Sequence, residues 1–514
     1  MRKLLYPVVP MKLNDLIEGL TMSQISGSTS EEIFGIAFNS KEVEPGFLFV
    51  AIRGATHNGH DFIPEAIRRG AKAIIAETVP ETQSEATRIT VPDTRIALAQ
   101  VAATFLNNPS LVLKVVGITG TNGKTTTSYL LESIFQAAGY NPGVIGTINY
   151  RFGNIVRQSL NTTPESLEIQ KLFADMVEEK VSHVAMEVSS HALDQNRVEG
   201  INFAVGVFTN LTPEHLDYHG TMEQYAQSKA KFFSRFLEQS KIAGEKFAVL
   251  NQDDPQTSYL CSLTSVSVVR YGMGNNVDIT IEEARVSQEG IRGILKTPRG
   301  NITFTSSLFG RFNLYNIMAA TGAALCLGTP LEAIRSGIGN FVSVPGRMER
   351  VGQERDFTIL VDYAHTPDAL EKALFSLREL APKRIITVIG CGGDRDRLKR
   401  PMMGKIAAQL SDIVVITSDN PRTEKPEDII AEIEEGVQSA GLEKISLSES
   451  PDRKGYFTMV DRFDAIQTAL GTAKRGDIVL VAGKGHEGYQ IIGKQRLPFD
   501  DRQKIKEALN KIKP

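Results

Sequence analysis

The stretch GITGTNGKTTT at positions 117–127 has the residue types and spacing of a phosphate-binding loop. A glycine-rich turn between a buried strand and a helix lets backbone N–H groups approach phosphates, and the helix N-terminus adds a favourable dipole. In such a loop Lys124 reaches the β- and γ-phosphates, and the Thr125 hydroxyl binds Mg²⁺. Ile118 stands where the usual spacing has a glycine, which argues against an ordinary kinase or GTPase loop. We predict a nucleotide site here, in preference to a tight turn with a purely structural role.

Two motifs downstream could bind the metal ion that accompanies a nucleotide. Glu187 follows an apolar run, where it is either a Mg²⁺ ligand or an ordinary exposed residue. The stretch NLTPEHLDYHG at 210–220 brings together Asn210, Glu214, His215, Asp217 and His219. Such a set suits a divalent ion, although histidine is not a typical Mg²⁺ ligand, and a capped helix start explains it equally well.

A lysine in the next predicted helix has unusual neighbours. Lys229 shares one helical face with Tyr225, Phe232 and Phe236. Its ammonium either snorkels to solvent or loses water and acquires a lowered pKa, which leaves a neutral amine for chemistry. The residue pattern by itself favours snorkelling.

Alternating strands and helices must position these residues. From about residue 112 apolar runs alternate with helical sequence, which indicates an α/β domain with a mainly parallel sheet. After FVSVPGRMER at 341–350, the runs FTILVDYAH, KRIITVIGCGG, DIVVITSDN and DIVLVAGKGH predict a second doubly wound unit. Ligands bind such units at the carboxyl ends of the strands. We predict an α/β protein with three domains, at 1–109, 110–343 and 344–514.

Composition narrows the class of protein. The 514 residues are 41% hydrophobic and 23% charged, and the net charge of −3 gives no general attraction to nucleic acid or acidic membranes. The three cysteines are widely separated, without metal or redox spacing. No apolar run approaches the roughly 20 residues that span a bilayer, and no signal peptide is expected. We expect a cytoplasmic enzyme or binding protein that acts without membrane insertion.

Ten motifs, in this order, resemble those of the ATP-dependent Mur ligases: GITGTNGKTTT, EVSSHALDQNRV, NLTPEHLDYHG, YAQSKAKFF, GRFNLYN, PGRMER, VDYAHTPDAL, GCGGDRDRLKRP, DNPRTEKP and AGKGHE. The resemblance covers essentially the whole chain. It implies an N-terminal UDP-binding domain, a central P-loop ATPase domain and a C-terminal Rossmann-like domain. It also implies that ATP and Mg²⁺ activate the carboxylate of UDP-N-acetylmuramoyl-L-alanyl-D-glutamate as an acyl phosphate, which the amine of meso-diaminopimelate then attacks. Separately, we expect a monomer.

The resemblance assigns roles to individual residues at the nucleotide. It implies ATP contacts at Gly120, Thr121, Asn122, Gly123, Lys124, Thr125, Thr126, Asn313, Arg347 and Asp362. It implies Mg²⁺ ligands at Thr125, Glu187, His215 and Lys229, the last as a carbamate, and catalytic roles for Lys124, Lys229 and His215. A carbamate requires a low-pKa amine, so the resemblance reverses the snorkelling interpretation of Lys229. Because two domains supply ATP contacts, it also implies domain closure during the cycle.

The two other substrates have implied residues of their own. Those for the UDP-linked substrate are Ser40, Thr162, Thr163, Ser189, Gln195 and Arg197. Those for diaminopimelate are Arg395, Asp419, Asn420, Pro421, Arg422, Gly483 and Glu487. Arg422 can grip a carboxylate bidentately, and lysine-adding relatives lack it. The sequence departs from the family pattern at Asn39 and Lys41, where DSR is usual, and more mildly at Glu214, where Asp is common.

Three alternatives differ from this interpretation. A Mur ligase that adds L-lysine fits the central motifs but not DNPR. A folylpolyglutamate synthase shares the loop and the carboxylate activation but should lack DNPR and the N-terminal domain. A non-catalytic nucleotide-binding regulator would show no phosphate release that depends on an amino acid.

Overall fold

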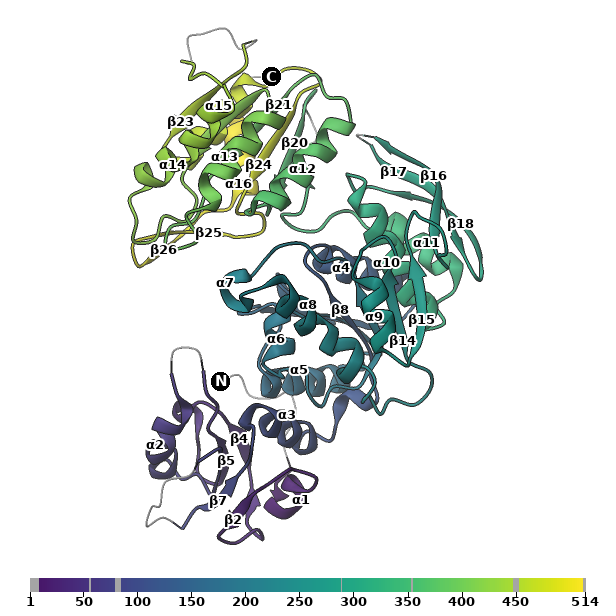
Figure 1. Cartoon of the computed structure of the whole chain (residues 1–514), viewed down its shortest axis with the longest axis vertical. Coiled ribbons are helices and arrows are strands. Elements are labelled where there is room, and N and C mark those ends of the chain that lie inside the picture. Colours follow the sequence, from purple (N-terminus) through teal and green to yellow (C-terminus); the bar gives the residue numbers. More distant parts are fainter. Residues whose placement is uncertain are drawn as a thin grey trace. The chain divides into compact units, whose positions relative to one another are not determined.

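The computed structural model describes residues 9–54, 57–78, 85–287, 289–352, 355–446 and 453–511 (Figure 1). The chain forms two compact units. The first comprises Met1–Thr280, Thr297–Gly300 and Met318–Gly337, and the second comprises Ile281–Lys296, Asn301–Ile317 and Ile338–Pro514. The α/β class with mainly parallel sheets is confirmed, whereas the domain boundaries at 109/110 and 343/344 stay predictions. Within the described ranges, no helix is long and apolar enough to cross a membrane.

The N-terminal part of the first unit contains a five-stranded sheet of order β2-β7-β6-β5-β4. Its strands are β2 (Gln24–Ser26), β4 (Gly35–Ala37), β5 (Phe47–Val50), β6 (Ala73–Ala76) and β7 (Thr87–Thr90). Apolar runs such as FLFV and AIIA give the sheet a buried centre. Helix α3 (Thr94–Phe105) begins at Asp93, whose carboxylate accepts from the N–H groups of Arg95 and Ile96 and so caps the helix.

The same unit holds an eight-stranded sheet of order β11-β10-β9-β12-β8-β13-β14-β15, parallel from β9 to β15. Its central strands are almost wholly apolar and buried, as expected for a sheet covered on both faces. The strands are β8 (Lys114–Thr119), β9 (Pro142–Ile145), β10 (Asn149–Phe152), β11 (Ile155–Gln158), β12 (His183–Glu187), β13 (Phe203–Phe208), β14 (Phe247–Asn251) and β15 (Ser267–Tyr271). Strand β8 lies between β12 and β13, and its carboxyl end leads into helix α4 (Lys124–Ala137).

Helix α8 (Met222–Lys231) continues into a π-helical turn at Phe232–Phe236. The predicted face of Tyr225, Lys229, Phe232 and Phe236 is buried throughout, with exposed fractions of 3% or less. Phe233, four residues after Lys229, is buried as well. This aromatic packing against β8 and β13 fixes the helix that holds Lys229.

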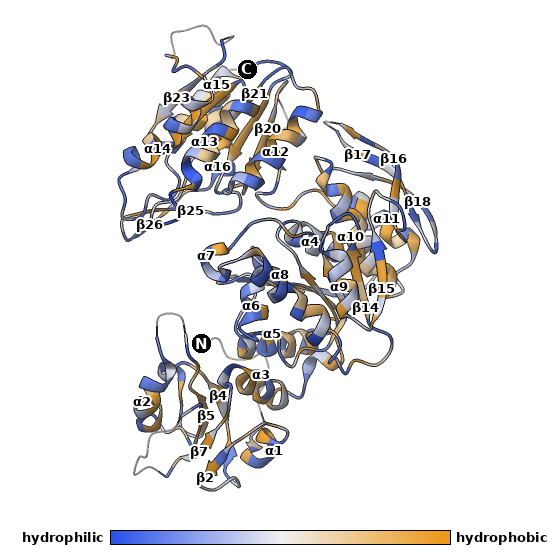
Figure 2. Ribbon diagram, in the orientation of Figure 1, coloured by the Kyte–Doolittle hydropathy of each residue, from blue (hydrophilic) through white to orange (hydrophobic). Residues whose placement is uncertain are grey.

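The second unit contains a six-stranded sheet of order β19-β20-β24-β21-β22-β23, parallel from β20 to β23. Apolar clusters fill both of its faces, and Figure 2 shows the hydrophobic strands between helices with hydrophilic outer sides. The strands are β19 (Glu349–Arg350), β20 (Thr358–Asp362), β21 (Ile385–Ile389), β22 (Ile413–Thr417), β23 (Gly455–Met459) and β24 (Ile478–Ala482). The helices are α12 (Pro367–Glu379), α13 (Lys399–Leu410), α14 (Pro426–Ser439), α15 (Arg462–Thr472) and α16 (Asp501–Lys511).

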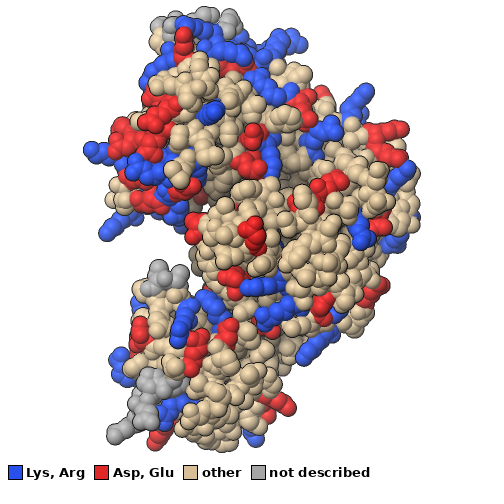
Figure 3. Space-filling view, viewed as in Figure 1, with Lys and Arg blue, Asp and Glu red and all other residues tan. Residues whose placement is uncertain are grey.

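Further elements include two small sheets and two helices. Strands β16 (Thr280–Ser287), β17 (Gly290–Thr297) and β18 (Gly300–Ser306) form a three-stranded sheet, and β25 (Tyr489–Ile492) pairs with β26 (Gln495–Pro498). Helices α10 (Phe312–Cys326) and α11 (Leu331–Asn340) follow β18 in the chain. On the face drawn in Figure 3, acidic and basic side chains are interspersed, in keeping with a net charge of −3.

Candidate active site

The glycine-rich loop follows β8 and is held by the end of the neighbouring strand β13. Gly120 and Gly123 have φ of +143° and +89°, a backbone conformation that favours glycine. A Cβ on Gly120 would lie 1.9 Å from Thr209 Oγ1, so the close approach of the two strands also requires glycine. Thr209 Oγ1 donates to the Asn122 carbonyl at 2.6 Å, and Asn122 N donates to Asn210 Oδ1 at 2.9 Å. The loop is therefore a fixed turn at a helix N-terminus, the arrangement that binds phosphate.

Two lysines converge on this loop. Lys124 Nζ and Lys229 Nζ donate to the Gly120 carbonyl oxygen at 2.8 and 3.0 Å. Lys229 is 2% exposed, with its Nζ 4.6 Å from the centroid of the Tyr225 ring. Burial, followed by the positive charge of Lys124, lowers the pKa of Lys229 well below its usual value, and Glu214 opposes that shift. The snorkelling interpretation is wrong, and the chain presents a buried amine that favours its neutral form.

Glu187 ends β12 beside β8 and is 1% exposed, so it is not the exposed strand-end residue considered as an alternative. Its Oε2 accepts from Thr125 Oγ1 at 3.0 Å and from Thr147 Oγ1 at 2.9 Å. Thr147 N donates to the other carboxylate oxygen at 3.1 Å. Carboxylate and hydroxyl oxygens are hard donors of the kind that Mg²⁺ prefers, so this set fits the ion.

His215 begins the short helix α7 (Leu216–His219) with a φ of +57°, and its side chain is 45% exposed. Its Nε2 lies 3.7 Å from Glu214 Oε2, and its ring packs edge-on against His191. Desolvation lowers the pKa of His215 despite the opposing charge of Glu214, which favours a neutral imidazole with a free lone pair. Among the described residues no group of three or more His, Cys, Asp or Glu could hold a metal ion. A Mg²⁺ ion here would complete its shell with phosphate and water oxygens.

Five of the six residues expected to contact the UDP-linked substrate meet at the end of β12. Thr163 Oγ1 donates to the Glu187 carbonyl at 2.8 Å and accepts from Ser189 N at 3.0 Å. Arg197 donates to the Thr163 carbonyl at 3.0 Å and to Gln195 Oε1 at 2.7 Å. The remaining member, Thr162, joins the group through Thr147, with 3.0 Å between their hydroxyl oxygens.

The sixth residue, Ser40, lies in the N-terminal part of the chain. It starts a single 3₁₀ turn, Ser40–Glu42, and donates to Glu65 Oε2 at 2.7 Å. Asn39 accepts from Lys41 N at 3.1 Å, so this departure from the family pattern preserves the cap of the turn.

In the second unit, Arg347 and Asp362 lie around the end of β20. The Asp362 carboxylate accepts from Met348 N at 2.7 Å and from Ala364 N at 2.8 Å. Burial raises the pKa of Asp362, and the nearby Arg347 opposes the shift. The Arg347 guanidinium lies 4.7 Å from the centroid of the Tyr363 ring.

The residue before Arg347 also approaches the loop that follows β24. A Cβ on Gly346 would lie 2.0 Å from His486 N, and one on Gly485 would lie 2.7 Å from the Gly346 carbonyl. The two segments therefore meet backbone to backbone. Asn313 lies near the start of α10, is 2% exposed and accepts from Asn316 Nδ2 at 2.8 Å.

The residues expected to bind diaminopimelate in the loops after β22 and β24 surround a lysine that the sequence reasoning missed. Lys484 is fully buried, and its Nζ lies 3.2 Å from Asp419 Oδ1, 3.1 Å from Asn420 Oδ1 and 3.3 Å from Glu487 Oε2. Asn420 Nδ2 also donates to Glu487 Oε2 at 2.9 Å. Gly483 has a φ of +112°, and a Cβ there would lie 3.6 Å from the Asp419 carboxylate. The lysine thus holds two carboxylates and an amide at the ends of adjacent loops.

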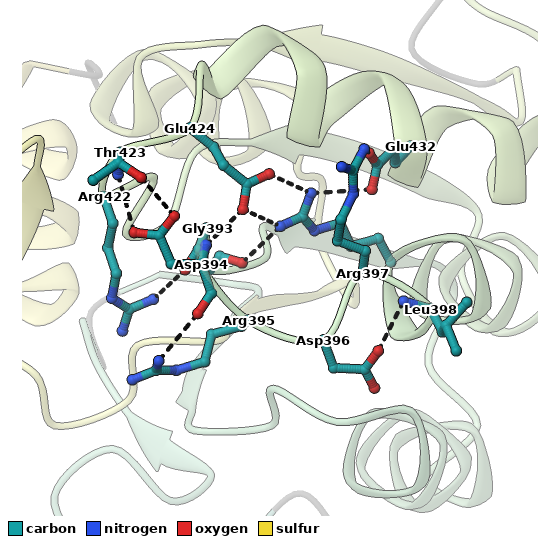
Figure 4. A network of polar contacts seen from close by, with 12 residues as sticks. Gly393, Asp394, Arg395, Asp396, Arg397, Leu398, Arg422, Thr423, Glu424 and Glu432 are labelled. Carbon is teal, nitrogen blue, oxygen red and sulfur yellow. Dashed lines mark hydrogen bonds and ion pairs between the residues drawn. The ribbon is translucent and has the colours of Figure 1, made fainter. Parts of the chain in front are cut away.

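The two expected carboxylate-binding arginines occupy the loops after β21 and β22. Arg422 follows Pro421 with a φ of +51°, and its Nη1 donates to the Gly393 carbonyl at 2.7 Å. Arg395 is exposed, and its Nη1 donates to the Asp394 carbonyl at 3.1 Å (Figure 4). Both guanidiniums keep further N–H donors for a ligand.

Family comparisons cover nearly the whole chain. The family model described as Mur ligase middle domain matches residues 118–324, that of the Mur ligase glutamate ligase domain matches 346–485, and that of the Mur ligase family catalytic domain matches 32–106. A relative from Geobacter metallireducens is 47% identical over 98% of this chain and 99% of its own length. The chain belongs to the Mur ligase family. A second Mur ligase, from Geobacillus thermodenitrificans, is 43% identical over 97% of this chain and 99% of its own.

Both relatives are named UDP-N-acetylmuramoyl-L-alanyl-D-glutamate--2,6-diaminopimelate ligase. A solved structure of a ligase with that name matches this Mur ligase with a TM-score of 0.71 and 31% identity, over 98% of this chain and 99% of the other. A folylpolyglutamate synthase from Mycobacterium tuberculosis has a TM-score of 0.61 at 18% identity and covers 76% of this chain. That likeness shows a shared fold alone.

Sequence reasoning missed Thr147, Lys484 and Tyr363, whose ring lies beside the Arg347 guanidinium. Thr147 gave no signal, because only the pairing of β9 with β12 brings it to Glu187. Lys484 stands inside the motif AGKGHE, where an apolar strand runs directly into a lysine, and this pattern could have indicated a buried ammonium.

Proposed function

We propose that this chain is an ATP-dependent ligase that joins meso-diaminopimelate to UDP-N-acetylmuramoyl-L-alanyl-D-glutamate, in the cytoplasm and as a monomer. The observation that supports it most directly is the cluster of Asn420, Glu487 and Lys484, together with Arg422 on the same loop as Asn420. Such a set offers an acidic group for an ammonium and a guanidinium for a carboxylate. The names of the relatives agree with this assignment.

The chemistry follows from the weakness of a carboxylate as an acyl donor. One carboxylate oxygen of the UDP-linked substrate attacks the γ-phosphorus of ATP, and ADP leaves. The amine of diaminopimelate then attacks the acyl carbon, phosphate leaves with the former carboxylate oxygen, and the nitrogen loses a proton. Neither step needs a covalent bond to the protein, so positioning and charge stabilisation supply the rate enhancement.

Each group of residues has a proposed part in these steps. The backbone N–H groups of residues 120–126 and the Lys124 ammonium hold the phosphates and stabilise the charge that develops during transfer. Thr125 and Glu187 would hold Mg²⁺, with His215 and a carbamate of Lys229 at a second ion. The metal, when bound, neutralises phosphate charge. Arg197, with Thr162, Thr163, Ser189, Gln195 and Ser40, would orient the UDP-linked substrate, and Asn313, Arg347 and Asp362 are the further ATP contacts.

Phosphate release by the purified protein tests the proposal. Reactions contain ATP, Mg²⁺ and the UDP-linked dipeptide, and either meso-diaminopimelate or L-lysine is added. We expect turnover with diaminopimelate alone. Turnover with lysine instead would retain the ligase and contradict the specificity, and release that ignores both amino acids would point to the nucleotide-binding regulator.

A further inference from the structure

A fully buried arginine connects the loops that hold Arg395 and Arg422. Arg400, in the first turn of α13, is 0% exposed. Its Nη1 and Nη2 donate to the two oxygens of Glu424 at 2.9 and 2.8 Å. Nη1 also donates to Glu432 Oε2 of α14 at 3.0 Å, and Nη2 donates to the Gly392 carbonyl at 3.2 Å. One guanidinium therefore holds the loop after β21, the segment after β22 and helix α14.

Further hydrogen bonds connect the same two loops (Figure 4). Asp394 N donates to Glu424 Oε1, so the carboxylate that binds Arg400 also fixes the backbone next to Arg395. The Asp394 carboxylate accepts from Thr423 Oγ1 at 2.6 Å and from Thr423 N at 3.3 Å. Together with the bond from Arg422 to the Gly393 carbonyl, these contacts set the spacing of the two arginines.

Glycines allow the two loops, and the helices α13 and α14, to approach each other closely. A Cβ on Gly393 would lie 1.9 Å from the Pro421 carbonyl, so the loops touch backbone to backbone. On α13 a Cβ at Gly404 would lie 2.1 Å from the Ile433 carbonyl, and on α14 one at Gly436 would lie 1.9 Å from the Pro401 carbonyl. The close packing of the two helices brings Arg400 to Glu432.

Stability alone is a weak reason to bury this group. The desolvation cost of an arginine and its carboxylates offsets much of their attraction, so apolar residues would stabilise the site as well or better. Arg400 lies away from the proposed pocket surface but contacts both of its loops. The bidentate geometry and rigid fork of a guanidinium suit it to fixing several acceptors at once.

We propose that Arg400 is a positioning residue for amino-acid selection, which sets the distance between Arg395 and Arg422 and thereby favours a ligand with a second, distal carboxylate. This inference rests on the proposed function of the pocket. A shift of the loops by about 1 Å would impair the grip on that carboxylate and reduce kcat/KM for diaminopimelate by up to about 100-fold, chiefly through a higher KM.

The test compares two conservative variants of the full-length enzyme. Arg400→Lys keeps the charge but cannot span Glu424, Glu432 and the Gly392 carbonyl. Arg397→Lys is the matched control, because Arg397 also pairs with Glu432 but from an exposed position. We expect Arg400→Lys to raise the KM for meso-diaminopimelate about 10- to 100-fold, with the KM for ATP and for the UDP-linked substrate within about 2-fold. Its preference for diaminopimelate over L-lysine should fall, and Arg397→Lys should match the unaltered enzyme.

A lower melting temperature with unchanged KM values would overturn the proposal and leave Arg400 a purely structural role. Hydrogen exchange provides a readout independent of activity, because Arg400→Lys should accelerate exchange in residues 392–396 and 420–424. Unchanged exchange there would also contradict the proposal. If the unaltered enzyme ignores every amino acid, the proposed function fails while exchange still decides whether Arg400 fixes the loops. If Arg400→Lys does not fold, Glu424→Gln removes the partner charge and carries the same comparison.

Discussion

Two buried lysines occupy opposite electrostatic surroundings in this chain. Lys229 in the first unit donates to a backbone carbonyl and faces the second cation Lys124, whereas Lys484 in the second unit contacts two carboxylates and an amide. Both are at most 2% exposed, so burial does not distinguish them. The difference teaches that neighbouring charge decides whether a buried lysine provides a reactive amine or a fixed cation that organises carboxylates.

Replacing Lys229 should have the largest effect on catalysis. We expect Lys229→Met to lower kcat for phosphate release about 1,000-fold, the upper range for loss of one stabilising group, with little loss of stability. Removing CO₂ should reduce the activity of the unaltered enzyme, and bicarbonate should restore it, since only a neutral amine forms a carbamate.

The exposed neighbour Lys231, which pairs with Asp194, provides the control. Lys231→Met should retain normal kcat. A Lys229→Met enzyme with normal kcat would show that Lys229 does not provide a reactive amine, so the functional contrast with Lys484 would fail.

Replacing Lys484 should mainly cost stability. Lys484→Met leaves the carboxylates of Asp419 and Glu487 without their cation, which should lower the free energy of unfolding by about 3–5 kcal/mol. Urea denaturation measures this directly. Lys504→Met, which breaks a surface pair with Glu507, should cost less than about 1 kcal/mol. Equal costs for the two variants would show that Lys484 is not the organising cation inferred here.

Replacing Arg422 tests whether the second unit, which holds Lys484, also selects the amino-acid substrate. Arg422→Lys keeps a cation but loses the planar fork, so the ratio of kcat/KM for meso-diaminopimelate to that for L-lysine should fall about 10- to 100-fold. Paired kinetics with the two amino acids measure the ratio. Arg496→Lys, an exposed residue of β26, should leave it unchanged. A constant ratio in Arg422→Lys would place selection elsewhere.

The smallest effect concerns a buried histidine in the sheet of the nucleotide loop. Burial, with the added charge of Lys114, lowers the pKa of His183 from 6.5 to about 4. The unfolded chain takes up this proton first, so the stability that His183 contributes is complete above pH 6.5 and is lost as the pH falls toward 4. At about pH 5.5 the loss should be about 1 kcal/mol.

His183→Phe should remove this part of the pH dependence, because phenylalanine retains the packing on Tyr140 without a titrating nitrogen. Urea denaturation at about pH 7.5 and about pH 5.5 compares the variant with the unaltered protein. If the free energy of unfolding of the variant fell as much between the two pH values as that of the unaltered protein, burial without a carboxylate would not suppress protonation at this position.

Local pattern predicted much of the fold. Apolar runs that end in glycine and polar residues located β8, β20, β21, β22 and β24, and helical periodicity placed Lys229 on a buried face. The π turn at Phe232–Phe236 was not predictable from that periodicity, because a regular helix would place the same aromatic residues on the buried face.

Contacts between distant strands were harder to predict. Strand β24 is inserted between β20 and β21, and this order brings Lys484 to Asp419. Likewise, the pairing of β9 with β12 brings Thr147 to Glu187. Single-sequence reasoning identifies the residues at strand ends but not which ends are neighbours.

The contact between Gly346 and Gly485 limits how the selectivity of this enzyme for its amino-acid substrate can change. Insertions or larger side chains in the segment 483–487 would displace the backbone beside Arg347, so new preferences acquired there would disturb the proposed nucleotide contact. The loop at 420–424 is joined to the same segment, because Asn420 contacts Lys484 and Glu487, whereas the hydrogen bonds described for the loop at 392–396 run to Arg400 and to residues 422–424. Evolution and protein engineering should therefore find altered selectivity in the loop at 392–396, while the segment 483–487 stays fixed in length.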